Sequence, residues 1–322
     1  MADDMKRSII GITLLAASAA AFAQADYPVK PIRIVVGYPP GGSGDFTTRL
    51  IADELGKELK ATVLVENKPG AGGSIASEFV AKSVPDGYTI LNQGNHAINK
   101  NLYKNLAYDF KDFIPVSRVA NGATVLVVRT DSPFKSLSEL VAFAKANPGK
   151  LFNAAAGFGS APHLAACAFE AVAGVKVTSV QFKGGGPASQ SLLAGDTQLM
   201  FATSPTVTGF IKGNRMRPLV VSLSKDSPSI PGVPGSENAG LPGFESTFWF
   251  GLHVPAGTPM EIVRKLHAAA VRGLSKPEVK EKIASQGMDA LPSVSPQAFA
   301  AEILAEAPRI ETAIKACGAK VE

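Results

Sequence analysis

The sequence predicts an α/β fold of two lobes joined by crossing strands, with a ligand cleft between the lobes. Two series of alternating strands and helices support this prediction, one in residues 32–91 and one in residues 125–201. The chain has 322 residues, 46% apolar and 18% charged, which is enough for two hydrophobic cores. Glycine-rich loops between strands and helices leave backbone amides open to an anion.

Residues 1–25 have the pattern of a secretory signal peptide. Lys6 and Arg7 precede an apolar run over residues 9–21, and small residues follow at Ala23 and Ala25. The run is shorter than the roughly 20 residues that cross a bilayer, which disfavours a retained membrane anchor. We expect cleavage after Ala25, with cleavage after Ala23 as the alternative.

The first predicted strand, residues 32–36, is apolar at nearly every position, as in a parallel strand buried on both faces. Gly41, Gly42 and Gly44 then let the backbone turn tightly, and Asp45 is expected to cap the following helix. The start of that helix presents unpaired amides and the positive end of its dipole. A carboxylate or a phosphate suits such a position.

The later elements follow in order. The first series continues with a strand at residues 62–66, a short helix ending at Lys82 and a strand at residues 88–91. The second series comprises strands at residues 125–128, 151–154, 177–182 and 198–201, with helices at residues 137–146, from Pro162 and up to Ala194. After a proline- and glycine-rich loop at residues 226–243 come a strand at residues 247–254 and helices from Thr258, at residues 277–286 and at residues 296–316, with residues 288–291 between the last two helices.

The simplest arrangement returns the C-terminal tail to the first lobe. Lobe 1 is then formed by residues 26–124 together with 248–322, and lobe 2 by residues 125–247. Chain crossings near Ala123 and Thr247 form a hinge, and a small molecule binds between the lobes. At the helix that follows residues 247–254, Thr258 is expected to be the cap, with Glu261 completing a capping box.

Charge and motifs exclude several functional classes. The net charge of +5 includes no run of Lys or Arg that could follow phosphates, which disfavours a nucleic-acid partner. Four scattered histidines without H-E-x-x-H or C-x-x-C spacing predict no metal site. The glycine loops match neither the dinucleotide pattern nor the phosphate loop of nucleotide-binding proteins, so no cofactor is expected.

The two cysteines, Cys167 and Cys317, leave two readings open. An exported protein meets an oxidising compartment, in which a disulfide forms readily. Both cysteines lie in alanine-rich, apparently helical surroundings, where a free cysteine behaves as a small buried apolar residue. The surroundings favour free thiols.

Several long segments, in order, resemble the solute-binding proteins of tripartite tricarboxylate transporters, the Bug family. They are PPGGSGDFTTR, VENKPGAGGSIASEFVAKSVPDGYTIL, AAGFGSAPHLA, FKGGGPASQSLLAGD and VPAGTPMEIVRKL, and the resemblance covers essentially the whole mature chain. It implies two Rossmann-like lobes of the type II periplasmic-binding-protein kind and a small carboxylate in the cleft. It also implies a periplasmic monomer without enzyme activity that delivers its ligand to membrane subunits, or that serves as a sensor.

The resemblance also implies the binding residues. They are Tyr38, Pro40, Gly41, Gly42, Ser43, Asp45, Asn95, Phe158, Gly159, Ser160, His163, Gly184, Gly185 and Thr203. Phe182 stands where relatives commonly have tyrosine, and the segment Ala202 to Ser204 lacks the acid that many relatives carry there. These departures favour a dicarboxylate or an aromatic acid over an amino acid, with Phe158 packed against it. Trp249 is expected to be a packing residue.

A secreted serine hydrolase is the alternative from another class. Its nucleophile would be Ser43 or Ser160, and His163 would be the base. The G-x-S-x-G frame is missing, because Asp45 stands where the last glycine is required. Binding without catalysis is therefore the prediction.

Overall fold

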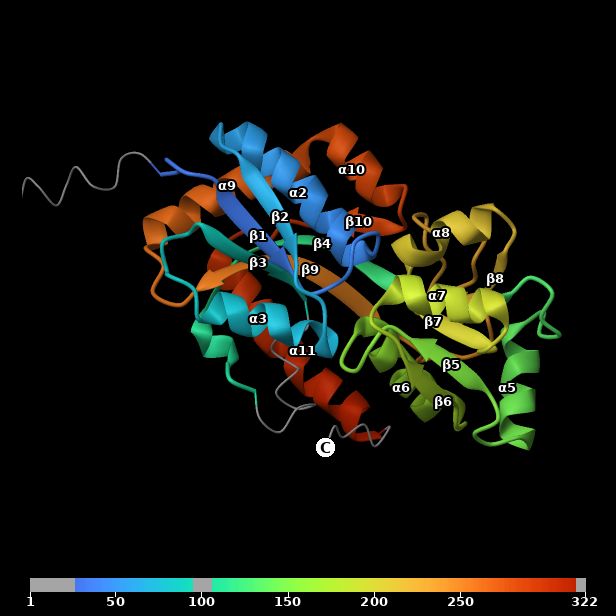
Figure 1. The fold of residues 1–322 in the computed structure, drawn as a ribbon. Helices are drawn as coiled ribbons and strands as arrows, with labels where there is room; N and C mark the ends of the chain where they lie inside the picture. Colours follow the sequence, from blue (N-terminus) through green and yellow to red (C-terminus); the bar gives the residue numbers. More distant parts are fainter. Residues whose placement is uncertain (1–26, 95–105, 317–322) are drawn as a thin grey trace, which may run out of the picture.

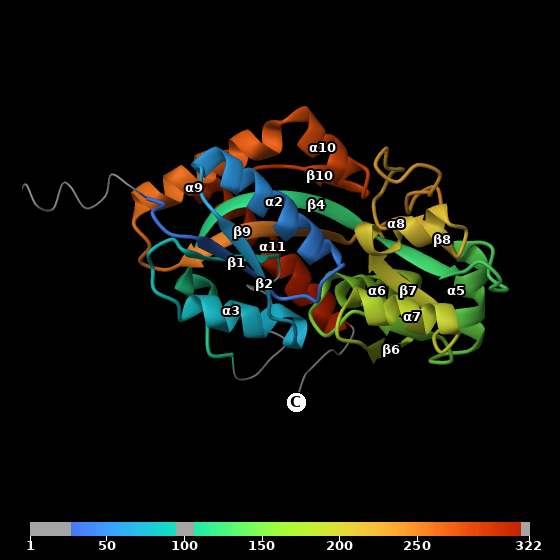
Figure 2. The same cartoon turned by 45° about the horizontal axis from the view of Figure 1, so that its top comes forward.

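The computed structural model describes residues 27–94 and 106–316, which form two α/β lobes side by side (Figures 1 and 2). The strands are β1 (Ile32–Val36), β2 (Val63–Asn67), β3 (Thr89–Gln93), β4 (Phe113–Arg129), β5 (Phe152–Ala155), β6 (Thr178–Gln181), β7 (Leu199–Thr203), β8 (Met216–Val221), β9 (Thr247–Pro255) and β10 (Met288–Ala290). The helices are α2 (Ser43–Leu59), α3 (Ser74–Ala81), α5 (Leu137–Ala146), α6 (Ala161–Ala173), α7 (Gly185–Ala194), α8 (Ser204–Lys212), α9 (Met260–Ser275), α10 (Pro277–Ala284) and α11 (Pro296–Ala316). Short 3-10 turns cover Ala71–Gly73 and Phe110–Asp112.

The strands form one curled, mixed sheet in the order β2-β1-β3-β9-β4-β7-β5-β6, and β8 and β10 also pair with β4. The pairs that β1 makes with β2 and β3, and that β5 makes with β6 and β7, are parallel, as predicted. The strand β4 belongs to both lobes, because its first half pairs with β9 and β10 and its second half with β7 and β8. The α/β class with two lobes is confirmed.

Only the second half of β4 is predicted from the sequence. The first half carries Pro115, Ser117 and Gly122, and its register with β9 shifts twice, between Pro115 and Ser117 and between Arg118 and Ala120. These residues and irregularities break the apolar alternation that predicts a strand. The strand β8, with Pro218 inside it, was missed for the same reason.

In lobe 1, strand β1 is buried on both faces, as predicted. Ile32 and Ile34 pack against Ile51 of α2 and the apolar face of α9, whereas Val35 packs on the opposite face against Val80 of α3. Figure 1 shows α2, α9 and α10 on one side of this part of the sheet and α3 and α11 on the other. The alternation of side chains along the strand therefore supports two helical layers.

In lobe 2, the second half of β4 has the same role. Leu126 and Val128 pack with Phe169 of α6 in one core, and Val125 packs with Leu192 of α7 in the other. Each lobe thus has a sheet covered on both faces, and both sheets are built on the same long strand.

Three buried polar residues join the lobes where the chain crosses between them. The amide of Thr124 donates to Ser222 Oγ at 3.0 Å, and the amide of Ser222 donates to the Thr124 carbonyl at 2.9 Å. The amide of Ser246 donates to the Ser222 carbonyl at 3.0 Å. These bonds continue the backbone pairing across the two crossing segments and satisfy polar groups that are away from water.

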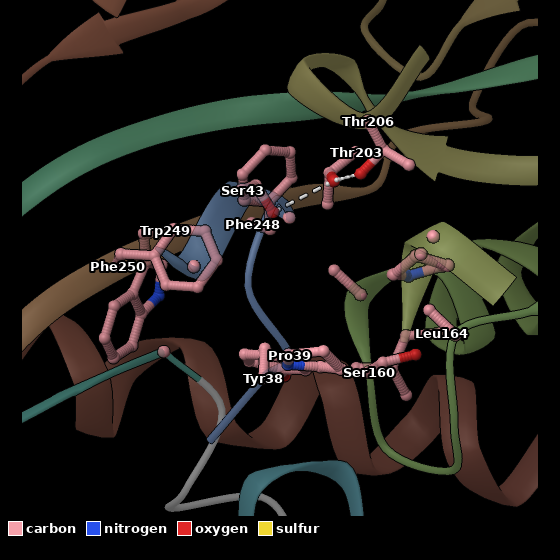
Figure 3. Close-up of a pocket in the computed structure, with 18 of the residues that line it drawn as sticks. Tyr38, Pro39, Ser43, Ser160, Leu164, Thr203, Thr206, Phe248, Trp249 and Phe250 are labelled. Atoms are coloured by element: carbon pink, nitrogen blue, oxygen red, sulfur yellow. Dashed lines mark hydrogen bonds between the residues drawn. The ribbon is translucent and has the colours of Figure 1, made fainter. Parts of the chain in front are cut away.

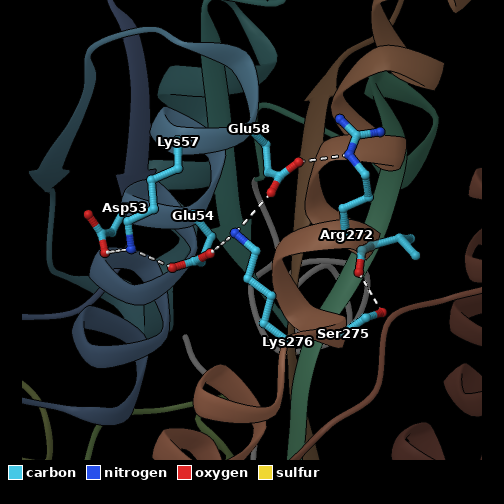
Figure 4. Close-up of polar contacts among 8 residues, drawn as sticks. Asp53, Glu54, Lys57, Glu58, Arg272, Ser275 and Lys276 are labelled. Carbon is cyan, nitrogen blue, oxygen red and sulfur yellow. Dashed lines mark hydrogen bonds and ion pairs between the residues drawn. The ribbon is translucent and has the colours of Figure 1, made fainter.

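An ionic network joins α2 to α9 on lobe 1 (Figure 4). The buried Glu54 carboxylate lies 2.7 Å from Lys57 Nζ and 2.9 Å from Lys276 Nζ. Lys276 also contacts Glu58 at 2.9 Å, and Arg272 Nε donates to Glu58 at 2.7 Å. Burial by itself raises the pKa of Glu54, but the hydrogen bonds from the two lysines outweigh it and leave the pKa lowered.

Two predicted helix caps are wrong. Helix α2 begins at Ser43 with Gly42 as its N-cap residue, so Asp45 lies inside the first turn. Helix α9 begins at Met260 without a side-chain cap, and Thr258 Oγ1 instead donates to the Pro255 carbonyl at 2.7 Å. In both places a bond within the preceding loop competes successfully with the cap.

The expectation of a free Cys167 is also wrong. Cys167, which is 3% exposed on α6, is disulfide-bonded. The other cysteine of the sequence, Cys317, lies outside the described residues. None of the described helices is long and apolar enough to cross a membrane.

Candidate functional site

A cavity lies between the lobes, at the ends of the strands where the glycine loops begin. Its volume is about 90 Å³, several times the roughly 10–15 Å³ that one water molecule needs. Both lobes contribute to its wall, and part of the lobe 1 contribution comes from α11. Figure 3 shows Trp249 and Phe250 of β9 on one side of this space and Thr203, Thr206 and Leu164 on the other.

Four helices begin at this cavity. The lining includes residues from the first turns of α2, α6, α7 and α8: Ser43, Gly44, Ala161, Pro162, Gly185, Gly186, Pro187 and Thr206. The first amides of a helix have no partner within the helix, and each N-terminus carries about half a positive charge. The four N-termini therefore favour an anion in the cavity.

The loop that leads into α2 is held by Asp45, which lies outside this cavity. The Asp45 carboxylate accepts from the Gly41 amide at 3.1 Å, from Asn67 Nδ2 at 2.9 Å and from Arg49 Nε at 2.9 Å. Burial raises the pKa of Asp45, and the hydrogen bonds from Arg49 and Asn67 outweigh it, so the pKa is lowered. The Gly41 amide is therefore occupied, and the amides of α2 remain for a ligand.

On the lobe 2 side, Ser160 is the N-cap residue of α6. Its hydroxyl accepts from the His163 amide at 3.4 Å and donates to the Gly157 carbonyl at 2.6 Å. Gly184 precedes α7 with a φ of 118°, a conformation that side chains disfavour, and a Cβ there would approach Pro39 of the other lobe to 2.9 Å. Glycine thus lets the two loops meet.

Direct hydrogen bonds connect the lobes beside the cavity. Thr203 Oγ1 donates to Ser43 Oγ at 3.0 Å, and Ser204 Oγ donates to the Gly287 carbonyl at 2.8 Å. Ser43 and Thr203 are 7% and 6% exposed, so this contact is largely sealed from water. The lobes are therefore in a closed arrangement.

The predicted site residues separate into groups. Those that line the cavity are Tyr38, Pro40, Gly42, Ser43, Ser160, Gly185 and Thr203. Gly41 and Asp45 line a neighbouring depression beside α2, and Phe158 and Gly184 line another with Tyr38. Gly159 precedes α6 and His163 lies in its first turn, and neither residue lines the cavity. The Gly159 amide donates to His163 Nδ1 at 3.3 Å. Asn95 lies outside the described residues.

The far wall of the cavity is not predicted from the sequence. This wall consists of Phe248, Trp249, Phe250, Glu306 and Ile310, and Leu164 and Met200 add further apolar surface. Trp249 was expected to be a packing residue. An aromatic run in β9 is a weak indication of a site, and no pattern in α11 indicates that its side chains reach a cavity formed by distant loops.

The charged groups of the cavity are few. Among its described lining residues, Glu306 has the only charged side chain, and no Lys, Arg or His is included. In residues 27–94 and 106–316, no group of three or more His, Cys, Asp or Glu side chains is placed to hold a metal ion. An anion bound here would be held by dipoles and hydroxyls rather than by a cationic side chain.

The geometry does not support the alternative serine nucleophile. Burial lowers the pKa of His163 from 6.5 to about 4, and its Nδ1 accepts from a backbone amide. Ser160 Oγ donates to the Gly157 carbonyl instead of to the imidazole, and Ser43 Oγ accepts from Thr203. Neither serine has the hydrogen bond to a base that activates a nucleophile.

The comparisons with known proteins decide the family. The model of the tripartite tricarboxylate transporter family receptor, TctC, matches residues 47–318. The chain belongs to the TctC receptor family. Members of this family and the solved relatives are periplasmic solute-binding receptors and not enzymes, so the predicted absence of catalysis rests on the family as well as on the site.

This TctC receptor is similar to its relatives along most of their length. The chain is 35% identical over 312 residues to the UPF0065 protein in the tcbD-tcbE intergenic region of Pseudomonas sp. strain P51, and the match covers 95% of this chain and 91% of that protein. It is 35% identical to protein BugT of Bordetella pertussis over 285 residues, 87% of each chain.

Two solved structures of relatives contain a carboxylate. Rpa4515 of R. palustris with adipate is 32% identical, has a TM-score of 0.87, and is matched over 91% of this chain and 99% of that one. MatC from Rhodopseudomonas palustris with bound malate is 32% identical, has a TM-score of 0.84, and is matched over 89% of this chain and 100% of that one.

Proposed function

We propose that this TctC receptor is exported through its N-terminal signal peptide, captures a small organic carboxylate between its lobes and delivers it to the membrane subunits of a tripartite tricarboxylate transporter. The convergence of four helix N-termini on one cavity, without a cationic side chain in its described lining, carries the proposal. Backbone amides bind an anion without the cost of burying a full counter-charge. The relatives with adipate and malate support a carboxylate as the ligand.

The cavity also favours an apolar portion in that ligand. Phe248, Trp249, Phe250, Leu164 and Met200 supply carbon surface from both lobes. Burial of apolar surface contributes about 25 cal/mol per Å² removed from water. The proposed ligand is therefore an aromatic acid or a medium-chain aliphatic acid rather than a small, highly hydroxylated one.

Gly186 offers a test of the anion site that keeps the fold intact. It lies in the first turn of α7 at the cavity, and a Cβ placed on it meets no atom within 4 Å. We expect Gly186→Asp to weaken carboxylate binding at least about tenfold by like-charge repulsion, whereas the neutral Gly186→Asn of nearly equal size stays within a few-fold of the natural protein.

The measurement is a thermal-shift screen of organic acids followed by isothermal titration of the acids that stabilise the protein. Equal loss of affinity in both Gly186 variants would show that shape rather than charge governs binding. A screen in which sugars or amines raise the melting temperature and no carboxylate does would refute the proposed function. Delivery is tested by uptake of the labelled acid in cells that lack this chain; unchanged uptake together with a lost transcriptional response would identify a sensor instead.

A further inference from the structure

On the Trp249 side of the cavity, opposite Thr203 and Thr206 at the start of α8 (Figure 3), lies a single acid, Glu306. It projects from α11 and is partly buried, and its Oε2 accepts a hydrogen bond from Trp249 Nε1 at 2.6 Å. Its other oxygen, Oε1, makes no hydrogen bond or ion pair in the part of the chain that the structure describes. A carboxylate oxygen at the wall of the binding cavity thus remains available as an acceptor.

The position of this carboxylate is restrained by Trp249. The Trp249 ring packs edge-on against Phe299 of the same helix with ring centroids 5.2 Å apart, and the indole N–H holds Glu306. A charge-assisted bond of this length is among the stronger hydrogen bonds in proteins. The Glu306 side chain is therefore a fixed part of the cavity wall rather than a mobile surface group.

The two ends of the cavity consequently prefer different chemical groups. The N-termini of α7 and α8 favour a negative charge, while Glu306 repels one and accepts a donor. A ligand with carboxylates at both ends would place one of them beside Glu306 in a site largely shielded from water, where like charges interact strongly. A ligand with a hydroxyl, amide or ammonium group at that end would instead gain a hydrogen bond.

We propose that Glu306 is a specificity-determining residue, which makes the site prefer a carboxylate with a hydrogen-bond donor at its far end over a dicarboxylate of equal length. This inference rests on the proposed binding function and narrows its ligand class. The segment Ala202 to Ser204 carries no acid, as noted from the sequence. Glu306 supplies one from a different element of the chain.

Two pairs of ligands matched in length test the proposal: adipate with 6-aminohexanoate, and terephthalate with 4-carbamoylbenzoate. Affinities for the natural protein are measured by isothermal titration at one salt concentration. Within the pair that binds more tightly, the member with the hydrogen-bond donor is expected to bind about tenfold more tightly than the dicarboxylate. Glu306→Gln keeps an acceptor for Trp249 but removes the charge, so its preference should fall to within about twofold.

Two variants control for indirect effects. Glu302→Gln changes an acid one turn earlier on α11 that pairs with Arg118 at 2.5 Å and does not line the cavity, and it should keep the natural preference. Trp249→Phe removes the indole donor but leaves the Glu306 charge, and it should keep the preference at lower overall affinity. Glu302→Gln also shows whether a substitution on α11 leaves the protein folded.

The outcomes separate the two proposals. If the dicarboxylates bind the natural protein as tightly as their partners, or if Glu306→Gln keeps the natural preference, the role of Glu306 is refuted while carboxylate binding stands. If none of the four acids binds and no carboxylate in the wider screen stabilises the protein, the proposed function itself fails.

Discussion

At the scale of single residues, the most unusual environment is that of His163. It is 4% exposed behind the N-terminus of α6, its ring lies 5.2 Å from that of Phe158, and its Nδ1 accepts the Gly159 amide. The hydrogen bond requires a neutral imidazole, and burial lowers the pKa of His163 to about 4. This histidine organises the loop beside the cavity without lining the cavity.

A stability prediction follows from that pKa. Between pH 6.5 and about 4 the unfolded chain binds a proton at this position and the folded chain does not, so the free energy of unfolding falls as the pH drops through this range. The loss amounts to about 3 kcal/mol at most. His163→Asn keeps a side-chain acceptor and cannot titrate, so urea unfolding from pH 7 to pH 4 should show a smaller decline than in the natural protein. Equal declines in the two proteins would contradict the assignment.

At the scale of elements, the contact between α2 and α9 depends on a buried acid. Glu54 is 3% exposed and receives hydrogen bonds from both Lys57 and Lys276, so it links the helix that follows the glycine loop to the C-terminal part of lobe 1. The N-terminus of α2 forms part of the cavity wall, and its position depends on how the rest of the helix is held.

Glu54→Gln is expected to lower the free energy of unfolding by about 2 kcal/mol at pH 7, because one hydrogen-bonded charge is lost from a buried position. The pKa of Glu54 is lowered, so the contribution is complete above the ordinary value of 4.5 and disappears as the pH falls through the lower folded value. The difference between variant and natural protein should therefore shrink in acid. Asp53→Asn, which changes the 61% exposed partner of Lys57, should cost less than about 0.5 kcal/mol. A similar loss in both variants would show that burial of Glu54 is unimportant.

At the scale of the whole molecule, the lobes are connected in two places, by the crossing segments and by direct contacts beside the cavity. Two segments carry the chain between the lobes at Thr124 and Ser246, while Ser43 and Thr203 meet directly beside the cavity. A ligand that contacts both Ser43 and Ser160 favours the closed form, since only that form offers both contacts. We propose that residues 26–124 with 248–322 and residues 125–247 move as two bodies about the crossing.

Small-angle X-ray scattering tests this motion. The ligand-free protein is expected to have a larger radius of gyration than the protein saturated with a tight carboxylate, and Thr203→Val, which removes the direct bond to Ser43, should widen the difference. Scattering profiles that coincide at saturation for the natural protein would exclude hinge closure.

The local signals in the sequence determined much of this protein. Apolar runs placed β1, β5 and β7, and the glycine loops placed the starts of α2 and α7, because both depend on residues that are neighbours along the chain. The long motifs led to the family, and seven of the predicted site residues line the cavity. Such features are encoded over a few neighbouring residues.

Only the tertiary structure decided the rest. Nothing near Glu306 or Trp249 indicates that α11 and β9 form the far wall of a cavity that begins at Ser43, more than 200 residues earlier in the chain. The first half of β4 was hidden because an irregular strand in the centre of a sheet is stabilised by its partners rather than by its own pattern. The caps at Asp45 and Thr258 failed because their oxygens had alternative partners within the folded loops. Contacts between distant segments select among the options that local sequence leaves open, and in this protein those contacts form the far wall of the cavity.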